Sequence, residues 1–92
     1  MRYDSIDPAI MAWATKHVLH VYTRHQDVEV RSVDLVGSRG ERSQIWIDPP
    51  DQRGTIHVHA WDYKTRRQDF TTSISDLPTC LEDAFDTAAR WI

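Results

Sequence analysis

The stretch Gly54–Tyr63, G-T-I-H-V-H-A-W-D-Y, shows the most regular alternation in the chain. Residues of one parity are apolar and those of the other parity carry rings: Ile56, Val58 and Ala60 against His57, His59 and Trp61. Because successive side chains of a strand point to opposite faces, this pattern predicts a strand with one face on a core. The other face would carry two imidazoles and an indole, which is unusual for a solvated sheet surface.

Segments on either side of this strand carry the same two-residue period. Apolar and polar residues alternate over residues 28–35, 43–48 and 69–75. In the first of these segments the apolar positions change parity near Ser32, which predicts a β-bulge there. Polar turns with glycine, proline or a basic run separate the segments, at residues 37–42, 49–54 and 64–67. The centre of the chain therefore predicts four strands joined by short loops.

The two ends of the chain carry a helical period instead. Asp7 followed by Pro8 is typical of a helix start, with Asp7 as the N-cap. Apolar residues then recur every three or four positions to about Arg24, which predicts an amphipathic helix. A second stripe of this kind begins at Leu77 and reaches Ile92, so it predicts a C-terminal helix.

The order helix, four strands, helix predicts the α+β class. We expect a two-layer sandwich in which both helices pack on one face of a four-stranded antiparallel meander. A chain of 92 residues has room for one hydrophobic core, so the expectation is a single domain over residues 1–92.

The composition restricts the class of protein. Hydrophobic residues make up 40% of the chain and charged residues 27%, with a formal charge of −3, as in a soluble globular domain. Cys80 is the only cysteine, so neither an internal disulfide nor a cysteine-based zinc site is expected. No apolar run is long enough to span a membrane, and the N-terminus lacks the pattern of a signal peptide. These features predict a cytoplasmic protein without a cofactor.

Both predicted helices are used on the apolar side of the sheet, so no segment remains to cover the opposite face. That face would carry rings on neighbouring strands, namely Trp46, His57, His59 and Trp61, with Tyr63 at its margin. Tryptophan and tyrosine are enriched in interfaces because they offer large rigid contact areas with a polar group. The sequence therefore predicts a binding protein that forms a homodimer or binds another protein through this face. The alternative is that polar side chains and chain ends cover the rings, which then have no function.

A metal- or anion-dependent enzyme is the competing interpretation. His57 and His59 would lie on one strand face about 6 to 7 Å apart at Cα, a spacing that can chelate one ion. A catalytic zinc needs three protein ligands, so we assign no metal site and keep these two histidines as candidates. Cys80 lies beside the apolar stripe of the last helix, and no serine lies in a nucleophile motif. The chain is therefore expected to bind rather than to catalyse.

A meander brings its first and third loops to the same end of the sheet. The basic residues of these loops form a candidate anion site: Arg39, Arg42, Lys64, Arg66 and Arg67. Acidic residues lie between them, so ordinary surface ion pairs are the alternative. The order of elements is similar to that of the double-stranded-RNA-binding domain, but the last helix has no lysine cluster to contact phosphates. We therefore expect no nucleic-acid partner and keep RNA binding as a minor alternative.

Overall fold

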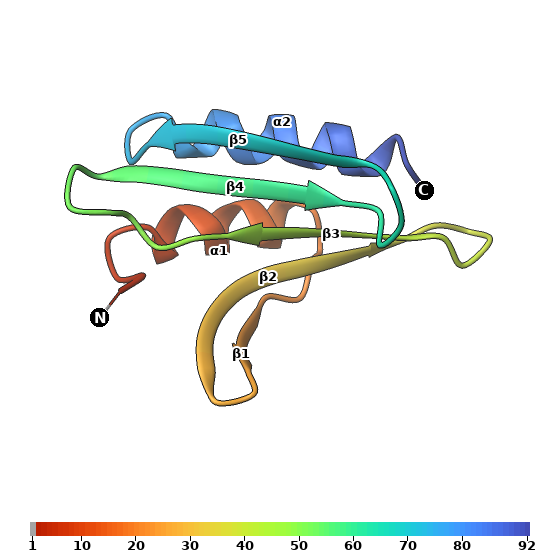
Figure 1. Ribbon diagram of the computed structural model, residues 1–92, viewed down its shortest axis with the longest axis horizontal. Helices are drawn as coiled ribbons and strands as arrows, with labels where there is room; N and C mark the ends of the chain where they lie inside the picture. Colours follow the sequence, from red (N-terminus) through yellow and green to blue (C-terminus); the bar gives the residue numbers. More distant parts are fainter. Residues whose placement is uncertain (1) are drawn as a thin grey trace.

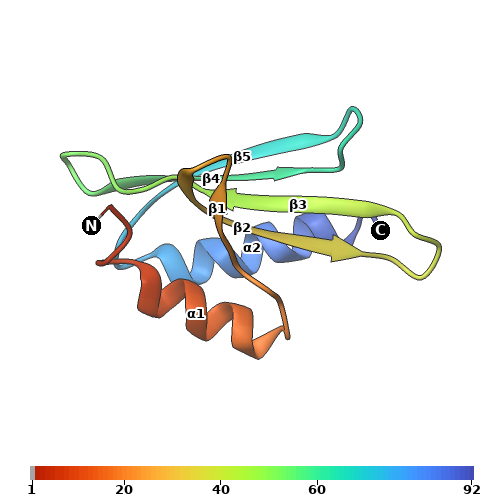
Figure 2. The same ribbon diagram turned by 90° about the horizontal axis from the view of Figure 1, so that it is seen from below.

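The computed structural model describes residues 2–92, with two helices on one face of a five-stranded sheet (Figures 1 and 2). The elements are α1 (Asp7–Lys16), β1 (Tyr22–His25), β2 (Val28–Val36), β3 (Arg42–Ile47), β4 (Thr55–Trp61), β5 (Arg67–Ser73) and α2 (Leu77–Ala89). The strands lie in chain order, each antiparallel to its neighbours. The predicted α+β sandwich is confirmed, but the sheet has five strands rather than four. Within residues 2–92, neither helix is long and apolar enough to cross a membrane.

The alternating apolar side chains of β3 and β4 form the centre of the core. These inward side chains are almost completely buried: Ile45, Ile47, Ile56, Val58 and Ala60. The helices cover them with apolar residues such as Ile10 and Leu81. Phe70 of β5 is only partly buried, and Ile74 is 45% exposed because it lies beyond the end of that strand. The rings of the other parity therefore lie on the face of the sheet away from the helices, which we call the open face.

The first helix is shorter than predicted, because α1 ends at Lys16 rather than near Arg24. The Leu19 N–H donates to the Ala14 carbonyl at 2.8 Å, which is the longer hydrogen bond of a Schellman termination motif. Val18 has the left-handed conformation that this motif requires, with φ of 55°, and it is 92% exposed. The apolar stripe thus continues in the sequence after the helix has ended, and periodicity alone cannot detect that end.

The segment after α1 forms a hairpin instead of a further helical turn. Gln26 and Asp27 have φ of 48° and 66°, as in a type I′ turn, and the paired residues His25 and Val28 flank them. The pairing of β1 with β2 shifts by one residue next to Ser32, at the predicted bulge. The pairs on either side of this shift are Tyr22–Ser32 and Arg24–Glu29.

Asp7 does not cap α1, and its carboxylate instead binds Arg31 of β2. Ile6 holds the N-cap position without a side-chain hydrogen bond. The guanidinium of Arg31 donates to both oxygens of Asp7, from Nε at 2.7 Å and from Nη2 at 3.0 Å. It also lies 4.4 Å from the centre of the Tyr3 ring. This bidentate pair fastens the start of α1 to β2, beside the hairpin.

His17 joins the end of α1 to α2. Its ring stacks on Phe85 with centroids 3.9 Å apart, and its Nε2 lies 2.5 Å from Glu82 Oε1. Lys16 donates from Nζ to the other oxygen of Glu82 at 2.7 Å. The hydrogen bonds from Lys16 and His17 hold the pKa of Glu82 below its ordinary value. Both helices are thus held together on one side of the sheet, which leaves the open face without cover.

Candidate functional site

The β1–β2 hairpin turns part of the open face into a groove. Figure 1 shows β1 and the first half of β2 bending away from the other strands, and Figure 2 shows the helices on the far side of the sheet. A concavity of about 720 Å³ lies between the hairpin and the open faces of β3 and β4. This volume is in the range of sites that hold a small ligand or part of a partner protein.

Aromatic and apolar side chains form much of the lining. Trp46 and Trp61 come from the open faces of β3 and β4, and Tyr22 and Val28 come from the hairpin. Tyr22 and Val28 remain 45% and 55% exposed. Exposed apolar surface gathered in one concavity is typical of an interaction site, whereas scattered apolar residues are ordinary.

The charged side chains of the groove are unequally paired. Its acidic residues are engaged within the chain, in the pairs Glu29–Arg31, Asp34–Arg42 and Asp48–His59. Arg2 and Arg24 also line the groove, and neither forms an ion pair with any residue from 2 to 92. The groove therefore combines an aromatic lining with two cations that have no counter-ion among residues 2–92.

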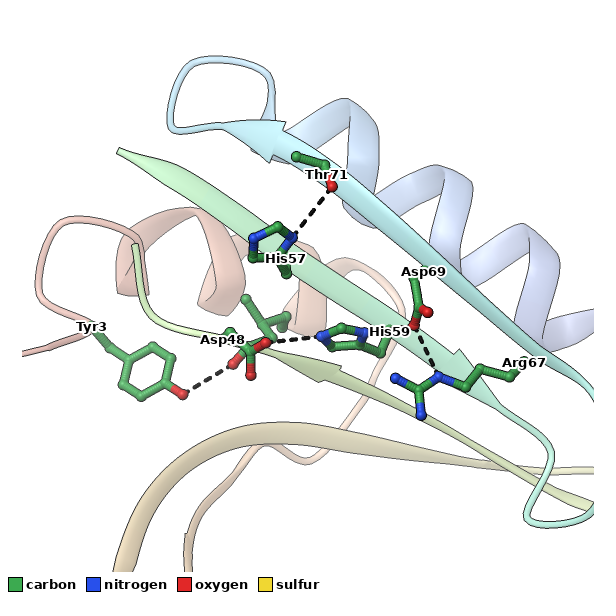
Figure 3. Close-up of polar contacts among 8 residues, drawn as sticks. Tyr3, Asp48, His57, His59, Arg67, Asp69 and Thr71 are labelled. Atoms are coloured by element: carbon green, nitrogen blue, oxygen red, sulfur yellow. Dashed lines mark hydrogen bonds and ion pairs between the residues drawn. The ribbon is translucent and has the colours of Figure 1, made fainter. Parts of the chain in front are cut away.

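His59 lies beside the groove and is held by two carboxylates (Figure 3). Its Nδ1 is 2.6 Å from Asp69 Oδ1, and its Nε2 is 2.8 Å from Asp48 Oδ2. Since a carboxylate only accepts hydrogen bonds, both bonds can form together only when each ring nitrogen carries a proton. The side chain is 14% exposed. This histidine is therefore a fixed part of the surface with no free nitrogen for a metal or a substrate.

Arg67 completes the cluster around His59. Its Nε donates to Asp69 Oδ1 at 3.0 Å, and its guanidinium carbon lies 5.2 Å from the centre of the Trp46 ring. The hydrogen bonds from His59 and from Arg67 hold the pKa of Asp69 below its ordinary value of 3.8. These contacts fix the orientation of Trp46, which provides one wall of the groove.

His57 is separate from this cluster. Its Nδ1 lies 3.3 Å from Thr71 Oγ1 on β5, and the ring is exposed (Figure 3). Among the described residues, no group of three or more His, Cys, Asp or Glu side chains is placed to hold a metal ion. The arrangement of His57 and His59 therefore supports polar surface contacts, not chelation.

The candidate anion site is divided between two surfaces. Arg42, Lys64 and Tyr63 share a smaller hollow of about 370 Å³ at the end of the sheet. Both Tyr63 and Arg42 bind Asp34, which lines the groove: the hydroxyl of Tyr63 donates to Asp34 Oδ1 at 2.5 Å, and Arg42 donates to the other oxygen at 3.0 Å. Arg67 belongs to the His59 cluster on the open face. Arg39 and Arg66 are exposed loop residues, and neither side chain has an ion pair within residues 2–92.

Cys80 is buried at 8% exposure in the first half of α2. Burial raises the pKa of its thiol above the ordinary value, and the nearby charge of Asp83 raises it further. A reactive thiol needs the opposite environment, with a lowered pKa and access to solvent. Cys80 therefore belongs to the core.

The structure adds residues that the sequence does not assign to a site. Tyr22 and Arg24 come from β1, which the helix prediction concealed. Val28 begins the strand that was predicted from residue 28, and Arg2 lies before the first helix. The available signal was the run Val21-Tyr22-Thr23, which is rich in strand-forming residues, followed by Asp27 in a position suited to positive φ. Comparison of the chain with protein-family models, curated proteins and solved structures gave no match.

Proposed function

We propose that this protein is a non-enzymatic binding module that holds an acidic segment of a protein partner in the groove of its open face. The observation that carries the proposal is the pairing of an aromatic lining with Arg2 and Arg24, which have no counter-ion among the described residues. A partner carboxylate placed between these guanidinium groups would replace water with charge-assisted hydrogen bonds. An apolar or aromatic side chain of the same segment would cover Tyr22 and Val28.

The residue types support a protein partner. Tryptophan, tyrosine and arginine are the residues that most often carry binding energy in protein interfaces. The walls of the groove are held in place before binding, by Arg67 over Trp46 and by the ring contact of Trp61 with Tyr63 at 4.7 Å. A surface that is already ordered loses less conformational entropy on binding.

The competing enzyme interpretation has less support. A general base or a metal ligand needs a ring nitrogen that is free to act, and both nitrogens of His59 already contact carboxylates. His57 lies on the exposed surface, outside the groove lining. The geometry therefore favours recognition over chemistry at this face.

The experiment uses two synthetic peptides of equal length. One has a central phenylalanine flanked by glutamates, and the other has lysines in place of the glutamates. We expect the acidic peptide to bind, measured by the change in tryptophan fluorescence, and the basic peptide not to bind. Affinity for the acidic peptide should fall as salt is added, because exposed charges are screened.

Matched arginine variants locate the site. Arg24→Ala should weaken binding of the acidic peptide about tenfold, the effect of losing one charge-assisted contact. Arg66→Ala removes the same charge from the loop after β4 and should leave the affinity unchanged. Equal binding of the two peptides, or equal effects of the two substitutions, would overturn the proposal.

A further inference from the structure

β5 is an edge strand without a proline, a glycine or a bulge that would interrupt pairing. It is last in the sheet order, and its seven residues contain neither proline nor glycine. Its pairing with β4 runs without interruption from Trp61–Arg67 to Thr55–Ser73. Regular edge strands of this length offer a row of unpaired backbone groups to another strand. In Figure 1, β5 is the outermost strand on its side of the sheet.

The hydrogen bonds of the β4–β5 hairpin show which backbone groups are free. The Asp62 N–H donates to the Arg66 carbonyl at 3.1 Å, so this pair is hydrogen-bonded. Because bonded and non-bonded pairs alternate in an antiparallel ladder, the residues with outward N–H and C=O groups are Arg67, Asp69, Thr71 and Ser73. The N–H and C=O groups of Asp69 and Thr71 have no hydrogen-bond partner among residues 2–92.

The opposite edge of the sheet is less suited to pairing. β1 has only four residues, and its ladder with β2 is shifted between Tyr22 and Arg24. Short and irregular edge strands are poor templates for a second strand. The free backbone groups of β5 therefore form the stronger site for adding a strand.

We infer that two copies of this chain pair through antiparallel β5 strands, which joins their sheets into one continuous sheet. In the register centred on Phe70, Asp69 lies opposite Thr71 of the second copy, and Arg67 lies opposite its Ser73. All four outward-facing residues of each strand are then used, with about eight new backbone hydrogen bonds.

A second copy of β5 fits this register because no like charges then lie opposite each other across the new ladder. A two-residue shift toward the start of β5 would place Asp69 directly opposite its own equivalent, and like charges across a ladder are destabilising. A shift in the other direction would place Thr71 opposite its equivalent and leave Arg67 without a partner in the strand. In the centred register the charge of Asp69 stays balanced by Arg67 and His59 of its own chain. The half-buried Phe70 then faces its equivalent on the helix side, as a cross-strand aromatic pair.

The test measures mass and amide exchange on the whole chain over a range of concentrations. Sedimentation should show the mass of two chains at high concentration. Backbone amides of Asp69 and Thr71 should become protected from hydrogen exchange as the dimer forms. Amides of Phe70 and Thr72, which point to β4, should be protected at every concentration. A single-chain mass at all concentrations, or fast exchange of Asp69 and Thr71 throughout, would overturn the inference.

Substitutions distinguish this interface from the open face. Thr71→Pro removes an outward N–H without removing a backbone hydrogen bond to β4, so it should give a folded monomer. Thr71→Val keeps the N–H and the branched shape and should remain a dimer. Trp61→Ser, on the open face, should also remain a dimer. If Trp61→Ser dissociates the dimer and Thr71→Pro does not, the copies meet at the open face and the inference is wrong. Because the exchange pattern is read on the unmodified chain, the test does not depend on Thr71→Pro folding.

Discussion

The imidazole of His59 lies stacked on the indole of Trp46, with ring centroids 4.6 Å apart and 23° between the ring planes. The two residues are direct cross-strand partners on β3 and β4. Asp48 and Asp69 hold the edges of the imidazole, and Arg67 lies over the indole. The indole of Trp46, which lines the groove, is therefore held between the imidazole of His59 and the guanidinium of Arg67. The histidine that draws attention as a metal candidate is better explained as the support of a binding surface.

Acid stability should depend on Asp69. Its folded pKa lies below the ordinary value of 3.8, so the carboxylate stabilises the fold above about pH 4. That contribution is lost as the pH falls through the folded pKa. His59→Leu should raise the pKa of Asp69 toward 3.8, and by more than Arg67→Leu does. Carbon-detected NMR titration of the Asp69 carboxyl measures this directly, and an unchanged pKa in His59→Leu would contradict the contact.

The hydroxyl of Tyr63 should titrate late in alkali. Burial first, and then the hydrogen bond to Asp34 and the charge of that carboxylate, together raise the pKa of this hydroxyl to about 12. The neutral phenol therefore stabilises the fold fully below pH 10, and this contribution is lost as the pH rises toward 12. The phenolate absorbance of Tyr63→Phe should lack this late transition. Asp34→Asn should shift it to lower pH, and a Tyr63 that titrates near 10 in the native chain would disprove the bond.

A glycine at the end of α1 should stabilise the protein against unfolding. Val18 combines a branched side chain with φ of 55°, a conformation that costs roughly 1 to 3 kcal/mol for residues other than glycine. Val18→Gly should therefore raise the midpoint of urea unfolding. Val36→Gly is the control, because Val36 is also exposed but lies in β2, where glycine weakens a strand. A lower midpoint for Val18→Gly would argue against the helix end described here.

The cost of shortening an isoleucine should follow its burial. Ile45→Ala removes a fully buried side chain of β3 and should cost about 2 to 5 kcal/mol in the free energy of unfolding. Ile74→Ala makes the same change at a residue that is 45% exposed and should cost much less. Chemical denaturation of the two variants provides the comparison. Equal losses would mean that Ile45 is not the fully buried core residue described here.

Much of the fold follows from local pattern in the sequence. The alternation of Ile56, Val58 and Ala60 predicts which face of β4 meets the helices, and the stripe from Leu77 predicts α2. The first helix shows a case in which the helical pattern gives the wrong end of the helix. Val18 and Val21 continue the helical spacing, although the chain has already turned at Val18 to form β1. Helical periodicity in a short stretch cannot exclude a strand, so the fifth strand was not predictable from spacing alone.

The candidate site was only partly predictable for a related reason. Trp46, Trp61 and the two histidines follow from parity within single strands. The partners of His59 depend on the register between strands, because Asp48 lies beyond the end of β3 and Asp69 lies across the β4–β5 ladder. The groove also depends on the bend of the β1–β2 hairpin, which no local pattern encodes. Side chains from Tyr22 and Arg24 therefore join the site only in three dimensions.

NMR mapping of the acidic peptide on the protein decides whether the groove is the binding site, because it reports which residues the ligand contacts. We expect the indole N–H signals of Trp46 and Trp61 and the amide signals of Tyr22 and Arg24 to shift on titration. Signals of residues 39–42 and 62–67 act as the internal comparison. Shifts confined to those two loops would place binding at the basic end of the sheet and would contradict the account.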